Sequence, residues 1–232
     1  MIVVKNLKKS FGNLTVLDHL NVDLDKGGIY AILGPNGSGK TTFLKTILGM
    51  VIPDEGTVLF DNQDISKSYN YRKNLGYLPQ IARFPDNITV SELIHMVIDI
   101  RQVAAKPESL IDLFGLAPFL DKKLGNLSGG TRQKVNIVLT FMFDTSVLIL
   151  DEPTAGLDPV SLIKLKELIS NAKKGGKIIL ITSHIMNLVE ELADQIIFLL
   201  EGEIHFHGSL DQLKEQTKGA DLEHAIASLL QP

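Results

Sequence analysis

A glycine-rich loop between an apolar strand and a helix constrains the fold of this chain more than any other feature. Residues 29–33 form a short apolar run, residues 34–41 match the pattern G-x-x-x-x-G-K-[ST], and a helix is predicted over residues 41–48. Glycines allow backbone N–H groups to close around phosphate oxygens, and the helix N-terminus adds the positive end of its dipole. The sequence therefore predicts a nucleotide-binding loop formed by Gly34, Asn36, Gly37, Ser38, Gly39, Lys40, Thr41 and Thr42.

Two side chains of this loop carry specific chemistry. Lys40 is expected to reach the β- and γ-phosphates of a nucleotide, and the Thr41 hydroxyl is expected to bind Mg²⁺. On its own the loop indicates a P-loop NTPase and leaves kinases, GTPases and motor proteins open.

The order of apolar runs and helical patterns predicts an α/β chain. Strands at 147–150, 177–182 and 195–200 alternate with helices at 159–172 and 186–193, which is typical of βαβ units and a mostly parallel core sheet. Strands at 2–7, 16–24 and 57–60 indicate an N-terminal antiparallel β-subdomain. Helices at 90–101, 109–114 and 131–143 indicate an inserted α-helical subdomain, and two helices at 210–218 and 222–230 close the chain. The prediction is a single domain with a core of 1–80 and 144–208, an insertion of 81–143 and C-terminal helices within 209–232.

A pair of carboxylates follows the apolar strand at 147–150. Ligands of such sheets bind at the carboxyl ends of the strands. Asp151 is therefore expected to hold Mg²⁺, and Glu152 is placed to polarise an attacking water as a general base. An ordinary turn before Pro153 is the alternative for an isolated Asp-Glu pair, and the phosphate loop favours the catalytic interpretation.

A second anion-binding helix N-terminus separates this chain from other P-loop enzymes. The predicted helix follows Leu127, Ser128, Gly129 and Gly130. A serine and two glycines at a helix N-terminus form a second site for an anion. With this LSGG signature the chain resembles the ABC ATPase family over essentially its whole length. The resemblance implies the ABC ATPase fold, hydrolysis of ATP with Mg²⁺, and a head-to-tail homodimer in which Ser128, Gly129 and Gly130 contact the ATP bound by the other subunit.

Other positions match the motifs of that family in order. Gln80 resembles the Q-loop glutamine, which binds Mg²⁺ and senses the attacking water. Asp158 resembles the D-loop aspartate at the dimer interface, and it also reads as a helix N-cap before Pro159. His184 resembles the switch histidine on the γ-phosphate. Phe11, where the family usually has tyrosine, resembles the aromatic residue that stacks on adenine, with Val16 nearby.

Composition limits the partners. The formal net charge of −4 argues against a nucleic-acid partner, and the absence of cysteine excludes disulfides and a cysteine nucleophile. No apolar run approaches the roughly 20 residues that span a bilayer. The resemblance implies a cytoplasmic ATPase, held on the inner face of the cell membrane by a permease that contacts residues 80–91.

The identity of the driven system stays open at this stage. Residues 77–85, 127–136 and 204–207 look like the ABC ATPases that serve nitrous oxide reductase maturation, a copper enzyme, and a generic exporter ATPase is the competing interpretation. An ATPase of a soluble scaffold, such as an iron–sulfur cluster system, and a nucleotide switch that does not hydrolyse ATP are the alternatives from other classes.

Overall fold

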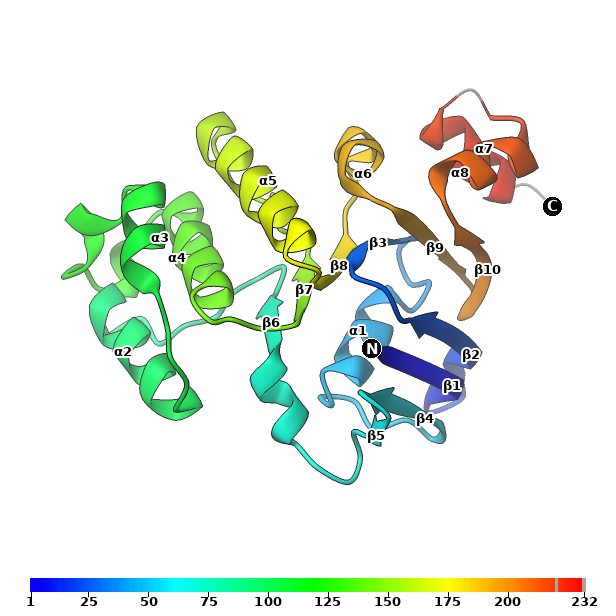
Figure 1. Cartoon of the computed structure of the whole chain (residues 1–232), viewed down its shortest axis with the longest axis horizontal. Coiled ribbons are helices and arrows are strands. Elements are labelled where there is room, and N and C mark those ends of the chain that lie inside the picture. Colours follow the sequence, from blue (N-terminus) through cyan, green and yellow to red (C-terminus); the bar gives the residue numbers. More distant parts are fainter. Residues whose placement is uncertain (220, 231–232) are drawn as a thin grey trace. The chain divides into compact units, whose positions relative to one another are not determined.

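The computed structural model describes residues 1–219 and 221–230, which fall into two compact units (Figure 1). The first unit combines Met1–Arg72 with Ile178–Pro232, and the second is Lys73–Lys177. Every helix in the described ranges is too short or too polar to span a lipid bilayer.

The N-terminal sheet of the first unit is antiparallel. It contains β1 (Ile2–Phe11), β2 (Leu14–Leu24), β4 (Glu55–Phe60) and β5 (Gln63–Asp64), in the order β2-β1-β4-β5. The first two strands are longer than predicted and form a hairpin whose turn contains Gly12 at φ 59°. The sequence of residues 8–15 is too polar to predict a strand. These residues nevertheless belong to the hairpin, because the backbone pairing of its two strands continues up to the turn.

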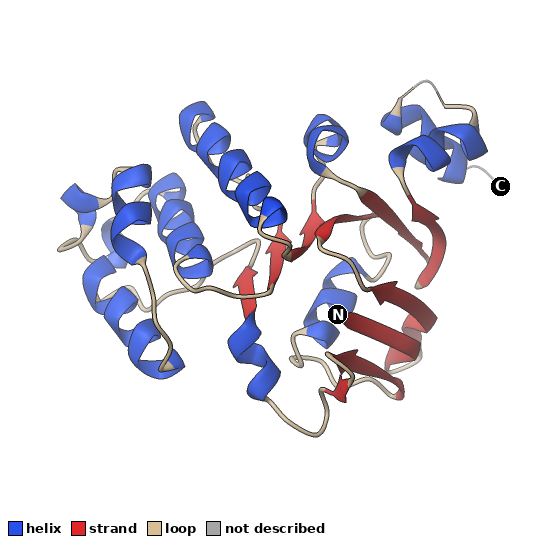
Figure 2. Cartoon of the chain, in the orientation of Figure 1, coloured by secondary structure: helices blue, strands red, loops and turns tan. Residues whose placement is uncertain are grey.

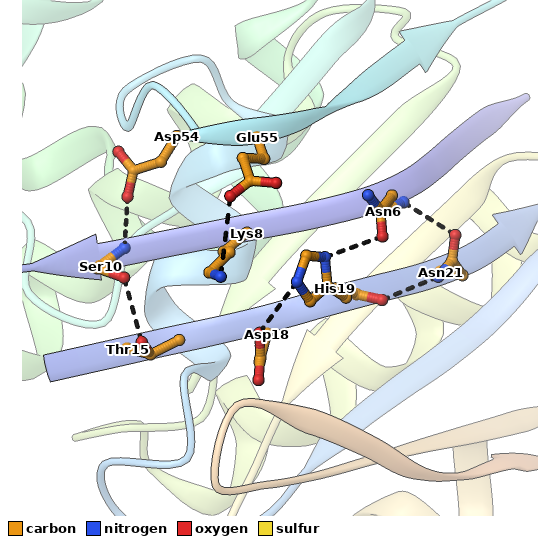
Figure 3. A network of polar contacts seen from close by, with 9 residues as sticks. All are labelled: Asn6, Lys8, Ser10, Thr15, Asp18, His19, Asn21, Asp54 and Glu55. Atoms are coloured by element: carbon orange, nitrogen blue, oxygen red, sulfur yellow. Dashed lines mark hydrogen bonds and ion pairs between the residues drawn. The ribbon is translucent and has the colours of Figure 1, made fainter.

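A network of polar side chains crosses this sheet where both strands of the hairpin bulge (Figure 3). Asn6 and His19 have φ values of 49° and 50°, and the β1–β2 register shifts on either side of Leu7. The Asn6 N–H donates to Asn21 Oδ1 (2.9 Å), the His19 ring nitrogen Nδ1 hydrogen-bonds Asn6 Oδ1 (2.9 Å), and Asn21 Nδ2 donates to the His19 carbonyl (2.8 Å). Asparagine tolerates the left-handed conformation better than most residues, which explains its presence at this bulge.

Asn6→Ala is expected to lower the free energy of unfolding by about 1–2 kcal/mol, because alanine is strained at this φ and the side-chain hydrogen bond is lost. Asn6→Gly is expected to lose less, since glycine adopts the conformation freely. Urea unfolding of the two variants measures the difference. Equal stability of Asn6→Ala and wild type would show that the network contributes nothing.

A second sheet completes the first unit. Parallel strands β3 (Gly28–Leu33), β8 (Ile178–Thr182) and β9 (Gln195–Leu200) place β3 between the other two, and β10 (Glu203–Gly208) pairs antiparallel with β9. Every residue of β3 and β8 is buried, as expected for central parallel strands. The helices of this unit are α1 (Lys40–Ile47), α6 (Met186–Leu192), α7 (Leu210–Thr217) and α8 (Leu222–Leu230), of which the last two pack together.

The second unit is mainly helical (Figure 2). Its strands β6 (Leu75–Leu78) and β7 (Val147–Asp151) are parallel, and its α-helices are α2 (Val90–Arg101), α3 (Pro107–Phe114), α4 (Gly129–Phe141) and α5 (Pro159–Lys174). Short 3₁₀ helices occupy Ala117–Phe119 and Leu124–Asn126, and a third, Asn70–Asn74, crosses the boundary from the first unit to the second along the chain.

Two elements of this unit differ from the prediction. Strand β6 was not predicted, because it is short and contains Gly76. A Cβ at Gly76 would lie 2.6 Å from a Leu148 methyl group and 2.9 Å from the Thr140 carbonyl, so this strand needs glycine to lie against its neighbours. Helix α4 begins at Gly129 rather than Thr131, because Ser128 caps it by accepting a hydrogen bond from the Thr131 N–H (3.2 Å).

The predicted fold class is confirmed by the parallel core strands, the antiparallel N-terminal sheet and the helical segment that stands between β6 and β7 in the sequence. The predicted boundaries of the core, insertion and C-terminal helices stay a prediction. Residues 220, 231 and 232 of the predicted C-terminal segment lie outside the described residues.

Candidate functional site

The loop between β3 and α1 is folded so tightly that two of its glycines leave no room for a side chain. Gly34 has φ 146° and Gly39 has φ 103°. A Cβ at Gly34 would collide with the Leu199 carbonyl oxygen, and a Cβ at Gly39 would lie 2.6 Å from the Val16 carbonyl oxygen. Gly37, at φ 84°, faces open space instead. The backbone conformation therefore selects glycine here, as the loop pattern requires.

The polar groups of this loop fit an anion. Ser38 Oγ is buried and has no hydrogen-bond partner within residues 1–219 and 221–230. Helix α1 begins after Gly39 without a side-chain cap and has no acidic residue in its first turn. Donors that lack partners at a helix N-terminus are the groups that bind phosphate.

Lys40 folds back over the loop. Its Nζ donates to the Gly34 carbonyl (2.8 Å) and to the Pro35 carbonyl (2.9 Å). Charged phosphate oxygens form stronger hydrogen bonds with an ammonium group than neutral carbonyls do. The two carbonyls hold the Lys40 ammonium within the loop, which also contains Asn36, Thr41 and Thr42.

His184 belongs to the same edge of the first unit as this loop. Strands β3 and β8 are parallel, and Ile32 pairs with Thr182. Gly34 and His184 therefore both follow the carboxyl ends of neighbouring strands, where ligands of such sheets bind. The His184 side chain is exposed, and the Ile185 N–H donates to Ser183 Oγ (3.0 Å) in the turn that carries it.

Phe11 and Val16 lie on the β1–β2 hairpin. The Phe11 ring is 51% exposed, and Lys9 Nζ lies 5.3 Å from its centroid. The Val16 carbonyl approaches Gly39 of the phosphate loop, so the structure brings the hairpin and the loop together. An exposed aromatic ring of this kind offers a free face to a planar ligand.

The acidic strand end belongs to the second unit. Asp151 ends β7 and is buried, and Glu152 has φ 48° in the turn that follows. Strands β6 and β7 are parallel, with Leu78 opposite Leu150, so Gln80 leaves the same edge of this pair. Burial raises the pKa of the Tyr77 phenol, and the Asp151 carboxylate raises it further. A non-glycine residue in the left-handed region is strained, and such strain concentrates at functional sites.

The signature and D-loop segments meet within the second unit. A Cβ at Gly130 would lie 2.7 Å from the Gly156 carbonyl oxygen, so the two loops are in close backbone contact. Lys134 on α4 pairs with Asp158 Oδ2 (2.7 Å), and Asp158 also caps α5 by accepting from the Ser161 N–H (2.9 Å). The hydrogen bond from Lys134, followed by those from Ser161, holds the pKa of Asp158 well below its usual range.

Sequence reasoning missed a set of buried polar residues on α4. Gln133 Nε2 donates to the Pro153 carbonyl (3.0 Å), and Asn136 Nδ2 donates to the Pro79 carbonyl (3.3 Å). Both carbonyls belong to neighbours of predicted site residues, Glu152 and Gln80. The available signal was the presence of two amides in a helix that is otherwise largely apolar.

The predicted site residues thus gather in two sets. Within the first unit the structure brings the phosphate loop together with Val16 and the strand end before His184. Within the second unit it brings the signature together with the D-loop, and Gln80 together with the acidic strand end. A phosphate loop of this conformation, between a parallel strand and a helix, defines a P-loop nucleotide-binding protein.

Comparison with known proteins narrows this class. A family model described as ABC transporter matches residues 17–155. The lantibiotic transport ATP-binding protein SrtF of Streptococcus pyogenes is 35% identical over 208 residues, which cover 88% of this chain and 89% of that protein. The chain belongs to the ABC transporter family, and it is an ATP-binding subunit of the ATP-hydrolysing type.

Solved structures agree with this assignment. One described as the ATP-binding subunit of an ABC transporter has a TM-score of 0.94 at 27% identity and covers 100% of both chains. The ATP-binding cassette MJ0796, in a dimeric post-hydrolysis state bound to ADP and Pi, has a TM-score of 0.80 at 26% identity over 90% of this chain and 99% of that one.

Proposed function

We propose that this chain hydrolyses Mg-ATP as one of two identical subunits and drives a separate membrane permease. The observation that carries the proposal is that two helices of one chain begin at glycine-containing N-termini that suit phosphate. In the loop before α1 the buried Ser38 hydroxyl has no hydrogen-bond partner among the described residues, and α4 begins with two glycines after its cap Ser128. One subunit needs only one such terminus for its own nucleotide, so the second would bind the nucleotide of another copy of the chain. The related cassette MJ0796 is dimeric, which supports this arrangement.

The predicted metal ligands suit Mg²⁺. Thr41 offers a hydroxyl, Asp151 a buried carboxylate and Gln80 an amide oxygen, and oxygen donors are what Mg²⁺ prefers. A bound Mg²⁺ would neutralise charge that develops on the phosphate oxygens.

The protein groups act by positioning and by electrostatics. In our proposal Lys40, Ser38 and the α1 N-terminus hold the phosphates, and Glu152 accepts a proton from the attacking water. His184 and Gln80 orient the γ-phosphate and that water. The γ-phosphate of the partner's nucleotide contacts Ser128, Gly129 and Gly130. The dimer therefore closes when ATP binds and opens after hydrolysis. Asp158 lies at the dimer interface.

Phe11→Ala is expected to weaken ATP binding about tenfold, because an aromatic ring stacked on a base contributes about 1–3 kcal/mol. Phe11→Tyr keeps the ring face and is expected to bind like wild type. Leu14→Ala is a matched control, since Leu14 lies on the same hairpin with its side chain 67% exposed. Titration with a fluorescent ATP analogue measures the affinities, and an equal loss in Leu14→Ala would remove the stacking role.

The surface proposed for the permease is the segment 80–91. It follows β6, and the Ile81 side chain is 69% exposed. An exposed apolar side chain beside Gln80 suits contact with a protein partner. We propose that this contact holds the chain on the inner face of the cell membrane. The relative SrtF is named for lantibiotic transport, which supports a transport role.

Co-purification from detergent-solubilised membranes of the host tests this function. A polytopic membrane protein in equal stoichiometry is the expected result. Its genomic neighbours would separate a generic exporter from the copper-enzyme maturation system that residues 77–85, 127–136 and 204–207 resemble. Recovery of soluble proteins alone would favour the assembly-scaffold alternative, and absence of phosphate release from ATP would favour a nucleotide switch.

A further inference from the structure

Helix α4 makes polar contacts with two segments that carry proposed active-site residues. Gln133 and Asn136 are three residues apart, so their side chains lie on one face of the helix. Their side chains are 6% and 3% exposed. Buried amides require hydrogen-bond partners, and those partners are backbone carbonyls of the segments around the active-site residues.

Gln133 contacts the turn after the acidic strand end. Its Nε2 donates to the carbonyl of Pro153, the residue that follows Glu152. Glu152 is in the left-handed region at φ 48°, a conformation that persists only where neighbouring contacts enforce it. Proline fixes its own φ, so a hydrogen bond at the Pro153 carbonyl limits the remaining freedom of the turn.

Asn136 makes the equivalent contact on the other segment. Its Nδ2 donates to the carbonyl of Pro79, the residue before Gln80. The two amides thus reach the carbonyls of two prolines, each adjacent to one proposed active-site residue. The hydroxyl of Ser128, the residue before α4, caps the same helix.

We infer that Gln133 and Asn136 are positioning residues that link the signature end of α4 to Glu152 and Gln80. This inference rests on the proposed function. A helix is stiff along its axis, so a displacement of its first turn by a partner's nucleotide is transmitted to both amides. The two amides then move the backbone beside the general base and beside the glutamine together.

Gln133→Met and Asn136→Leu remove the donors while keeping the approximate volume of the side chains. Each variant is expected to lower kcat for phosphate release at least about tenfold, since small displacements of a catalytic group have effects of this size. KM and the affinity for a non-hydrolysable ATP analogue are expected to stay within about twofold of wild type, because the two amides bond to the Pro153 and Pro79 carbonyls and neither residue belongs to the proposed nucleotide-binding loop.

Thr140→Val is the matched control. Thr140 is buried on the same helix. Its Oγ1 is within hydrogen-bond distance of the Asn136 carbonyl (2.8 Å) and of the Tyr77 carbonyl (3.1 Å), and neither carbonyl belongs to a residue adjacent to a proposed active-site residue. This variant is expected to lower the urea midpoint as much as the other two and to keep kcat within about twofold of wild type. An equal loss of kcat in Thr140→Val would mean that the loss of kcat in Gln133→Met and Asn136→Leu comes from lower stability of the protein. That result would overturn the inference.

A Glu152→Gln variant assayed in parallel separates the inference from the proposed function. Wild-type turnover by Glu152→Gln would overturn the role of Glu152 as general base in the proposed function. Loss of turnover in Glu152→Gln with wild-type kcat in both Gln133→Met and Asn136→Leu would overturn only the positioning role. In the Glu152→Gln background, Gln133→Met is expected to leave the ATP-dependent dimer intact, because the amide acts on the base and not on nucleotide binding.

Discussion

Replacement of Glu152 by glutamine is expected to lower steady-state ATP hydrolysis by about 10²–10⁴-fold, the usual contribution of a general base. Glutamine has nearly the shape of glutamate and cannot accept the proton of the attacking water. The phosphate loop is untouched by the change, so ATP still binds. Without hydrolysis, the γ-phosphate that the signature of the other subunit contacts stays in place. The ATP-bound dimer therefore accumulates.

Phosphate release and size-exclusion chromatography with ATP measure the two effects. Glu167→Gln is the matched control, because it removes the same charge from an exposed position on α5 of the second unit. The control is expected to hydrolyse ATP at the wild-type rate and to give no trapped dimer. Equal hydrolysis by Glu152→Gln and wild type would remove Glu152 from the role of base.

The parts of the molecule that were predicted correctly depend on local chemistry. The phosphate loop is encoded in consecutive residues, because glycine alone tolerates the backbone at Gly34 and Gly39 and the flanking strand and helix have clear apolar patterns. The cap at Asp158 also follows from a short-range signal, the proline after it. The acidic strand end was predicted for the same reason, since it terminates an apolar run.

The parts that were missed depend on residues far apart in the sequence. Strand β6 has too few residues for a periodic signal, and the fit of Gly76 against Leu148 and Thr140 exists only after the chain has folded. The bonds from Gln133 and Asn136 join residues separated by 20 and 57 positions, so no window of sequence contains both partners. Secondary-structure propensity depends on residues close together in the sequence. Strand β6 and the hydrogen bonds of Gln133 and Asn136 depend on tertiary contacts instead.

A mixture of two inactive variants is expected to recover ATPase activity if the signature acts on the partner's nucleotide. Lys40→Ala removes the ammonium from the phosphate loop, and loss of such a group lowers turnover by about 10²–10³-fold. Ser128→Asp keeps an N-cap acceptor on α4 but places a negative charge beside the γ-phosphate. Each homodimer then has two defective sites.

In the mixed dimer the two defects fall in one site. The phosphate loop of the Ser128→Asp subunit faces the signature of the Lys40→Ala subunit, and both of these are intact. Random pairing makes half of the dimers mixed, and each has one intact site, so about a quarter of wild-type activity is expected if the sites act independently. Ser209→Asp is the control for the substitution, since Ser209 caps α7 in the same way and has no proposed role at the nucleotide.

Phosphate release measured across mixing ratios gives the result. Activity that peaks at equal amounts and vanishes for either variant alone requires a site built from two copies of the chain. Activity that stays at the level of the inactive homodimers at every ratio would mean that Ser128 serves the nucleotide of its own subunit. The head-to-tail arrangement would then be wrong, while the phosphate loop and the acidic strand end would keep their roles, because neither depends on which subunit supplies the signature.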